Sequence, residues 1–265
     1  MGSGVVDHAD STGAGARFGK GDSQWITTGK GVVHSEMFPL LNDDKPNPLD
    51  LYQIWINLPA KSKMVPPEFK MFWAEETPTI KRDSVGGTAK VTVIAGKYED
   101  VNPLPPPKAS WAADPSADVA VWLIELEPGA AIKLPAPNTA EAKRMLYVHG
   151  GDGVRVTIAG TPLSDQQGFL ADQGTGPEHR LMVKNIAQKP ATILLLQGRE
   201  IGEPVAQQGP FVMNTQAELQ QAYADYQRTR FGGWKWGSDG PTYAKDSPRF
   251  ADYGDGKKVY PPAAK

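Results

Sequence analysis

The sequence contains no cysteine. This absence excludes disulfide bonds, thiolate metal sites and cysteine-based catalysis. Long apolar runs are absent too, since no stretch approaches the roughly 20 residues that a membrane-spanning helix needs. The first residues show no basic segment followed by an apolar one, so we expect a cytoplasmic protein without a secretion signal. The formal net charge is only −2, and therefore no nucleic-acid or anionic-membrane partner is expected.

Histidine is also scarce, with four in 265 residues. Two of the residue types that bind metals nevertheless lie close together, because His34 and Glu36 are separated by one residue. Residues at positions i and i+2 of a strand project from the same face. An imidazole nitrogen with a carboxylate oxygen suits iron, manganese or zinc. The simpler alternative is a pair of strand residues that hydrogen-bond to their neighbours.

Short apolar segments, separated by glycine, proline and Asn/Asp turns, dominate the chain. The 28 glycines and 24 prolines supply abundant turn residues, and such spacing without long helices favours barrels or sandwiches over a βαβ fold. We therefore predict an all-β protein with strands at 51–58, 90–94, 119–126, 154–158 and 192–196. The proline-rich stretch 100–107 is typical of a stiff linker or a long loop. It predicts an N-terminal domain at 1–115, a C-terminal domain at 116–234 and an extended tail at 235–265.

One helix is expected, at 215–231. Thr215 and Glu218 form a capping box, in which each side chain satisfies a backbone N–H of the first turn. Leu219, Tyr223 and Tyr226 then fall on one face, and the helix should pack on a barrel. The tail that follows carries aromatic residues that would hold it on the surface: Tyr243, Phe250, Tyr253 and Tyr260.

Five segments in collinear order share the wording of one known family: 21–37, which contains Gly-Lys-Gly-Val-Val-His-Ser-Glu-Met, and 53–61, 90–96, 198–205 and 209–215. Together they resemble the pirin family. The resemblance implies a bicupin, that is, two β-barrel domains in one chain.

The resemblance also implies a metal site. Pirins hold one metal, iron (Fe²⁺), in the N-terminal cupin through a His-x-His pair, a third histidine and a glutamate. The last two match His34 and Glu36, whereas no His-x-His occurs in this chain. We therefore expect an N-terminal barrel without its first strands, open at its edge, and a closed C-terminal barrel. With two ligands only, no tight stoichiometric iron is expected.

Three functions remain open under this resemblance. The first is a metal-dependent flavonol (quercetin) dioxygenase, in which Glu36 would be both a metal ligand and the acceptor of the substrate proton, with activity impaired by the missing ligands. The second is a non-catalytic partner of a regulatory protein. The third is an inactive gene fragment. A flavonol-like aromatic substrate and a monomeric chain are expected.

The remaining histidines receive simpler interpretations. His8 matches a position near the pirin metal site that is not a family ligand, so it should support the ligands from outside or lie in a loop. His149 and His179 are expected in solvent-exposed turns. The position of a His-x-His in the second cupin is filled by 134–139, Leu-Pro-Ala-Pro-Asn-Thr, and that domain should be metal-free.

Overall fold

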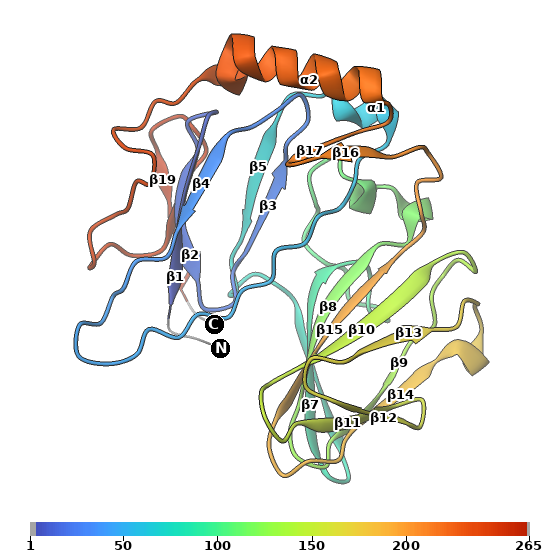
Figure 1. Cartoon of the computed structure of the whole chain (residues 1–265). Helices are drawn as coiled ribbons and strands as arrows, with labels where there is room; N and C mark the ends of the chain where they lie inside the picture. The colour runs from blue at the N-terminus through green and yellow to red at the C-terminus, as the bar shows by residue number, and fades with distance from the viewer. Residues whose placement is uncertain (1–3, 264–265) are drawn as a thin grey trace. The chain divides into compact units, whose positions relative to one another are not determined.

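The fold is described from a computed structural model, which describes residues 4–263. The chain forms two compact units, each built mainly from β-sheets (Figure 1). The first unit takes the chain up to Glu76, Pro106–Ser110 and the chain from Gly202 onward. The second unit takes Thr77–Pro105 and Trp111–Ile201. No helix among the described residues is long and apolar enough to cross a bilayer.

A five-stranded sheet is the main layer of the first unit, in the order β19-β18-β2-β1-β4. A second layer pairs β3 with β5, and β16 pairs with β17. The strands are β1 (Val5–Asp10), β2 (Gly15–Gly19), β3 (Ser23–Thr27), β4 (His34–Met37), β5 (Glu68–Phe72), β16 (Ala206–Gln208), β17 (Phe211–Met213), β18 (Phe250–Asp252) and β19 (Lys258–Val259). The helices are α1 (Ala60–Lys63), α2 (Gln216–Thr229) and the 3-10 turn η4 (Arg230–Gly232).

The second unit contains a six-stranded sheet, β13-β10-β15-β8-β7-β6, and a four-stranded sheet, β12-β11-β14-β9. Its strands are β6 (Thr79–Ser84), β7 (Gly87–Ala95), β8 (Ala120–Leu126), β9 (Ala131–Leu134), β10 (Lys143–His149), β11 (Arg155–Ile158), β12 (Thr161–Ser164), β13 (Gly168–Ala171), β14 (Leu181–Asn185) and β15 (Ala191–Gly198). Three 3-10 turns complete it: η1 (Trp111–Ala113), η2 (Pro115–Ala117) and η3 (Pro177–His179).

Alternation along the strands builds the core of the second unit. Trp122, Ile124 and Leu126 of β8 are fully or almost fully buried and lie two residues apart, so they share a face. They pack with Leu146, Ile193 and neighbouring apolar residues into one cluster. Buried apolar area of this kind is the main stabilising contribution to folding, at roughly 25 cal/mol per Å².

The helix prediction is confirmed in detail. Thr215 caps α2, and the reciprocal hydrogen bonds of the capping box with Glu218 are both present. The helix ends at Arg230, which adopts a left-handed conformation. Tyr223 and Tyr226 contact the ring of Phe211 on β17, so this face of the helix packs on a strand.

Most of the predicted strands are present, but one prediction is wrong. Residues 90–94, 119–126, 154–158 and 192–196 coincide with β7, β8, β11 and β15, with ends that differ by at most three residues. Residues 51–58 form no strand, although their composition favours one. Leu51, Ile54 and Trp55 are exposed there. A strand needs a hydrogen-bonded neighbour, and none of the sheets described for residues 4–263 includes this segment.

The division into units differs from the boundary that we expected near residue 115. β7, which precedes that boundary, pairs with β8, which follows it, so both strands belong to the second unit. The segment 235–265, expected as a surface arm, is instead built into the first unit within its described part. Its strand β18 pairs with β2, and Phe250 and Ala251 are buried.

Candidate metal centre

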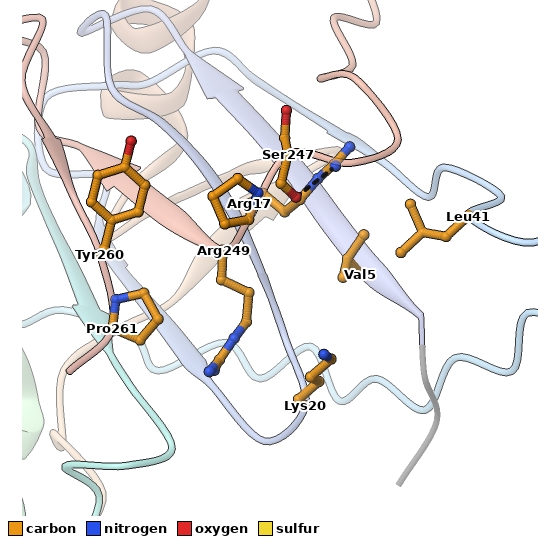
Figure 2. Close-up of a pocket in the computed structure, with 9 residues that line it drawn as sticks. Val5, Arg17, Lys20, Leu41, Ser247, Arg249, Tyr260 and Pro261 are labelled. Atoms are coloured by element: carbon orange, nitrogen blue, oxygen red, sulfur yellow. Dashed lines mark hydrogen bonds between the residues drawn. The ribbon is translucent and has the colours of Figure 1, made fainter. Parts of the chain in front are cut away.

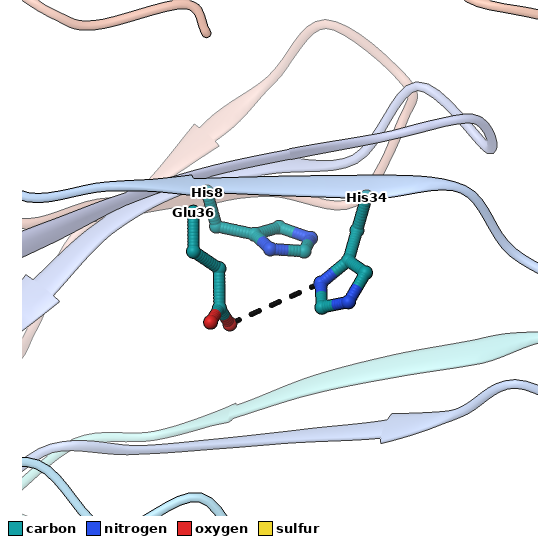
Figure 3. Close-up of side chains that lie close together, drawn as sticks. All are labelled: His8, His34 and Glu36. Atoms are coloured by element: carbon teal, nitrogen blue, oxygen red, sulfur yellow. Dashed lines mark ion pairs between the residues drawn. The ribbon is translucent and has the colours of Figure 1, made fainter. Parts of the chain in front are cut away.

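Strands β1 and β4 bring the site residues together through their register. The two strands are antiparallel, with His8 opposite Glu36 and Asp10 opposite His34. Directly opposite residues share a face, as do residues two positions apart. All four side chains therefore lie on one face of the sheet, and His8, His34 and Glu36 offer ligand atoms within 4.8 Å of one another. Figure 3 shows these three side chains gathered on one side of the strands.

His8 is the buried member of this cluster. Its side chain is 0% exposed, and its Nε2 lies 3.2 Å from Oδ2 of Asp10. Its Nδ1 has no hydrogen-bond partner within the described part of the chain. The tautomer that donates Nε2–H to the carboxylate leaves the lone pair on Nδ1. A buried polar atom without a partner costs roughly 1–3 kcal/mol, and a bound cation would remove that cost.

Asp10 holds His8 in this orientation. Its Oδ1 accepts hydrogen bonds from the backbone N–H of Thr12 at 2.8 Å, from the Thr12 hydroxyl at 2.6 Å and from the N–H of Ala14 at 3.2 Å. Burial would raise the pKa of Asp10, but the hydrogen bonds from His8 and Thr12 outweigh it and hold the pKa below its ordinary 3.8. A histidine ligand whose second nitrogen binds a carboxylate is the arrangement that protein metal sites use to fix a ring.

His34 and Glu36 form the more accessible side of the cluster. Their side chains are 42% and 20% exposed, and Nδ1 of His34 lies 4.0 Å from Oε1 of Glu36. Burial lowers the pKa of His34 below its ordinary 6.5, and the nearby His8 acts in the same direction, against Glu36 and Asp10. The imidazole is therefore neutral at neutral pH, which is the form that binds metals. Gln53 donates to Oε2 of Glu36 at 3.3 Å.

The structure thus brings together the two residues that the sequence singled out and adds one that it set aside. The signal for His8 was its spacing from Asp10, two residues apart in Val-Val-Asp-His-Ala-Asp. This segment is the strand β1, not a loop. His149 lies in β10 and His179 in η3. Neither belongs to a group of three possible ligands among the described residues, where His8, His34 and Glu36 form the one such group.

A cavity of about 420 Å³ in the first unit is lined by residues outside this cluster. Figure 2 shows the residues that line it. Arg17 and Arg249 line it together with Lys20, but both guanidinium groups are already neutralised. Arg17 binds Asp7, and Arg249 binds Asp22 and Glu75. None of the residues that line the cavity belongs to the ligand cluster, so the cluster remains the candidate centre.

Comparison with known proteins identifies the family. Residues 121–232 match the pirin C-terminal cupin domain, and residues 1–56 match the pirin family. A pirin-like protein of Solanum lycopersicum is 33% identical over 230 residues, which cover 86% of this chain and 71% of the relative. This chain belongs to the pirin family. The pirin of Homo sapiens is 30% identical over 230 residues, covering 86% of this chain and 71% of that protein.

The fold of this pirin also matches a solved structure. The crystal structure of a quercetin 2,3-dioxygenase from Acinetobacter baumannii is 30% identical and covers 87% of this chain and 73% of its own, with a TM-score of 0.71. The expected fold is therefore confirmed: a mainly β bicupin with one long C-terminal helix.

Proposed function

We propose that this pirin is a metal-dependent oxygenase of flavonol-like aromatic substrates, with divalent iron held by His8, His34 and Glu36. The observation that carries the proposal is the set of ligand atoms within 4.8 Å of one another. Two histidines and one carboxylate are the ligand set of non-haem iron oxygenases. The solved quercetin 2,3-dioxygenase with the same fold supports the choice of substrate class.

The third ligand changes what the sequence alone suggested. Two ligands would leave a metal held weakly, which was the reason to expect no tight iron. His8 offers a buried, oriented and otherwise unpartnered nitrogen among the described residues, and three protein ligands leave coordination positions for substrate and oxygen. When bound, the metal would supply Lewis-acid polarisation of a coordinated substrate oxygen.

The side chains around the cluster have separable roles in this proposal. Glu36 has two carboxylate oxygens, so it can hold the metal and accept the proton of a flavonol hydroxyl. Gln53 orients Glu36 by donating to Oε2. Phe69 of β5 stacks on the ring of His8, with centroids 5.5 Å apart and an interplanar angle of 18°. It shields that ring from water.

Metal binding and flavonol turnover test the proposal in two steps. Anaerobic titration with Fe(II) should give one equivalent bound, with His8→Ala and His34→Ala each weakening the affinity at least about tenfold. His179→Ala is the matched control, since it removes a histidine outside the cluster. Flavonol absorbance under air should then fall with the wild type, and Glu36→Gln should slow that fall.

The outcomes distinguish the candidate functions. Affinity that is equal in wild type and His8→Ala would exclude His8 as a ligand. One equivalent of bound metal without consumption of any flavonol would refute the oxygenase proposal and leave the non-catalytic role. No binding of Fe(II) by the wild type would refute the metal site and, with it, the oxygenase proposal.

A further inference from the structure

We propose that the C-terminal segment 234–253, here called the strap, is a positioning element of the candidate metal centre. Through Trp236, Tyr243 and Tyr253 it fixes the strand and the ring of His8. The inference rests on the proposed metal site, and the strap lies in the same unit as the cluster. It assigns a role in the metal site to a segment that carries no ligand.

The strap hydrogen-bonds to the backbone of the two residues that form the His8–Asp10 pair. Nε1 of Trp236 donates to the carbonyl oxygen of Asp10 at 2.8 Å. The hydroxyl of Tyr243 donates to the carbonyl oxygen of His8 at 3.3 Å. Both donors come from residues more than 220 positions away in the chain. The side chain of Asp7, one residue from His8 in the strand, points away from the cluster and accepts the backbone N–H of Tyr243, so the strap holds β1 from the face opposite to the cluster.

A buried ion pair anchors the strap at this place. The guanidinium of Arg17 donates to both oxygens of Asp7 at 2.7 and 2.8 Å, and also to the carbonyl oxygens of Tyr243, Ala244 and Ser247. Asp7 in turn accepts the backbone N–H of Tyr243 at 2.8 Å. Arg17 and Asp7 side chains are 1% and 0% exposed, so water does not compete for these bonds.

The strap lies directly against bare backbone of β2. A Cβ atom at Gly15 would lie 2.6 Å from the hydroxyl oxygen of Tyr243 and 2.8 Å from Cη2 of Trp236. Real Cβ atoms essentially never make contacts this short. Glycine at this position lets both aromatic side chains approach β1 closely enough to reach its carbonyl groups.

Past this point the strap contacts Phe69, the residue that stacks on the ring of His8. β18 pairs with β2, and Tyr253 follows it directly. The ring of Tyr253 meets the ring of Phe69 edge-on, with centroids 5.5 Å apart, and Phe69 stacks on His8. The strap thus restrains His8 through its backbone on one side and through its ring on the other.

A restraint of this kind has a measurable consequence. Groups that orient a ligand from outside the coordination sphere typically change metal affinity by 10- to 100-fold when removed. Linkage also requires the reverse effect: if the strap favours metal binding, bound metal must stabilise the strap by the same factor.

The test measures the metal affinity of variants that lose a hydrogen-bond donor of the strap but keep an aromatic side chain at that position. Trp236→Phe removes the indole N–H, and Tyr243→Phe removes the hydroxyl. Tyr223→Phe is the matched control, because its hydroxyl also donates to a backbone carbonyl, that of Gln208 at 3.2 Å, away from β1. The dissociation constant of manganese(II) is read from the electron paramagnetic resonance of the free ion, with His8→Ala as reference.

We expect the double variant Trp236→Phe/Tyr243→Phe to bind manganese(II) about tenfold more weakly than wild type, and Tyr223→Phe to bind it normally. Manganese should also slow amide hydrogen exchange at 236–244 in the wild type and leave exchange in α2 unchanged. Unaltered manganese affinity in the double variant, together with a clear loss in His8→Ala, would refute the positioning role of the strap but not the metal site. Absence of manganese binding by the wild type would refute the metal site and, with it, the role of the strap.

Discussion

The Arg17–Asp7 pair provides the sharpest test of the physical argument for the first unit. Arg17→Met keeps a long apolar stem but removes the guanidinium. Asp7 is 0% exposed, and of its hydrogen-bond partners among residues 4–263 only the backbone N–H of Tyr243 would remain. Breaking a buried pair from one side costs about 3–5 kcal/mol, because a desolvated charge is left without its partner.

This loss is large relative to ordinary stability. At 1.36 kcal/mol per factor of ten, it raises the population of the opened state by roughly two to four powers of ten. Domains have only about 5–15 kcal/mol of unfolding free energy in total. Because Arg17 also donates to carbonyl groups of the strap, the strap should open together with β1 and β2.

The assay must report on the first unit alone. Hydrogen exchange of peptides covering β1 and β2, followed against urea concentration by mass spectrometry, gives the free energy of opening of these strands. The double variant Asp7→Leu/Arg17→Met is the control. It should recover part of the loss, because apolar replacement of a whole buried pair is often neutral.

The double variant should recover only part of the lost stability, since it still lacks the hydrogen bonds from Arg17 to the carbonyl groups of the strap. The coupling between the two positions follows from the double-mutant cycle. A loss below about 1 kcal/mol in Arg17→Met, or a double variant less stable than the single one, would refute the reasoning.

Three further predictions concern packing, pH and metal. Gly15→Ala should destabilise the first unit by about 1–3 kcal/mol through overpacking, whereas Gly237→Ala, with no atom within 4 Å of its Cβ, should not; equal urea midpoints would contradict the close fit. The hydrogen bond from Arg249 lowers the pKa of Glu75 below its ordinary 4.5. The ion pair therefore stabilises the fold fully above about pH 4.5, and this contribution is lost as the pH falls through the folded-state pKa. Arg249→Met should reduce the decrease in melting temperature at acid pH, and an unchanged decrease would exclude the pair as its cause. With free metal at 100 times its dissociation constant, chelation should remove about 2.7 kcal/mol of stabilisation and so lower the melting temperature. An equal drop in His34→Ala would show that the metal binds elsewhere.

Local chemistry explains the parts of the structure that the sequence predicted. The capping box of Thr215 and Glu218 acts within four residues, so α2 could be placed from its own residues. The apolar segment 119–126, bounded by turn residues, predicted β8 for the same reason. His34 and Glu36 also lie two positions apart, so their shared face was predictable. The resemblance to pirins supplied the bicupin fold around them.

Tertiary structure decided the rest, because it depends on which distant segments become neighbours. Residues 51–58 have the composition of a strand, but a strand exists only through hydrogen bonds to a neighbour, and the described sheets give them none. The tail, in contrast, looked like a surface arm and gained a partner in β2. His8 became a candidate ligand only through the register that sets it opposite Glu36. The sequence determined which ligand atoms the chain could offer a metal. The pairing of β1 with β4 determined that the atoms of His8, His34 and Glu36 lie close enough together to bind one.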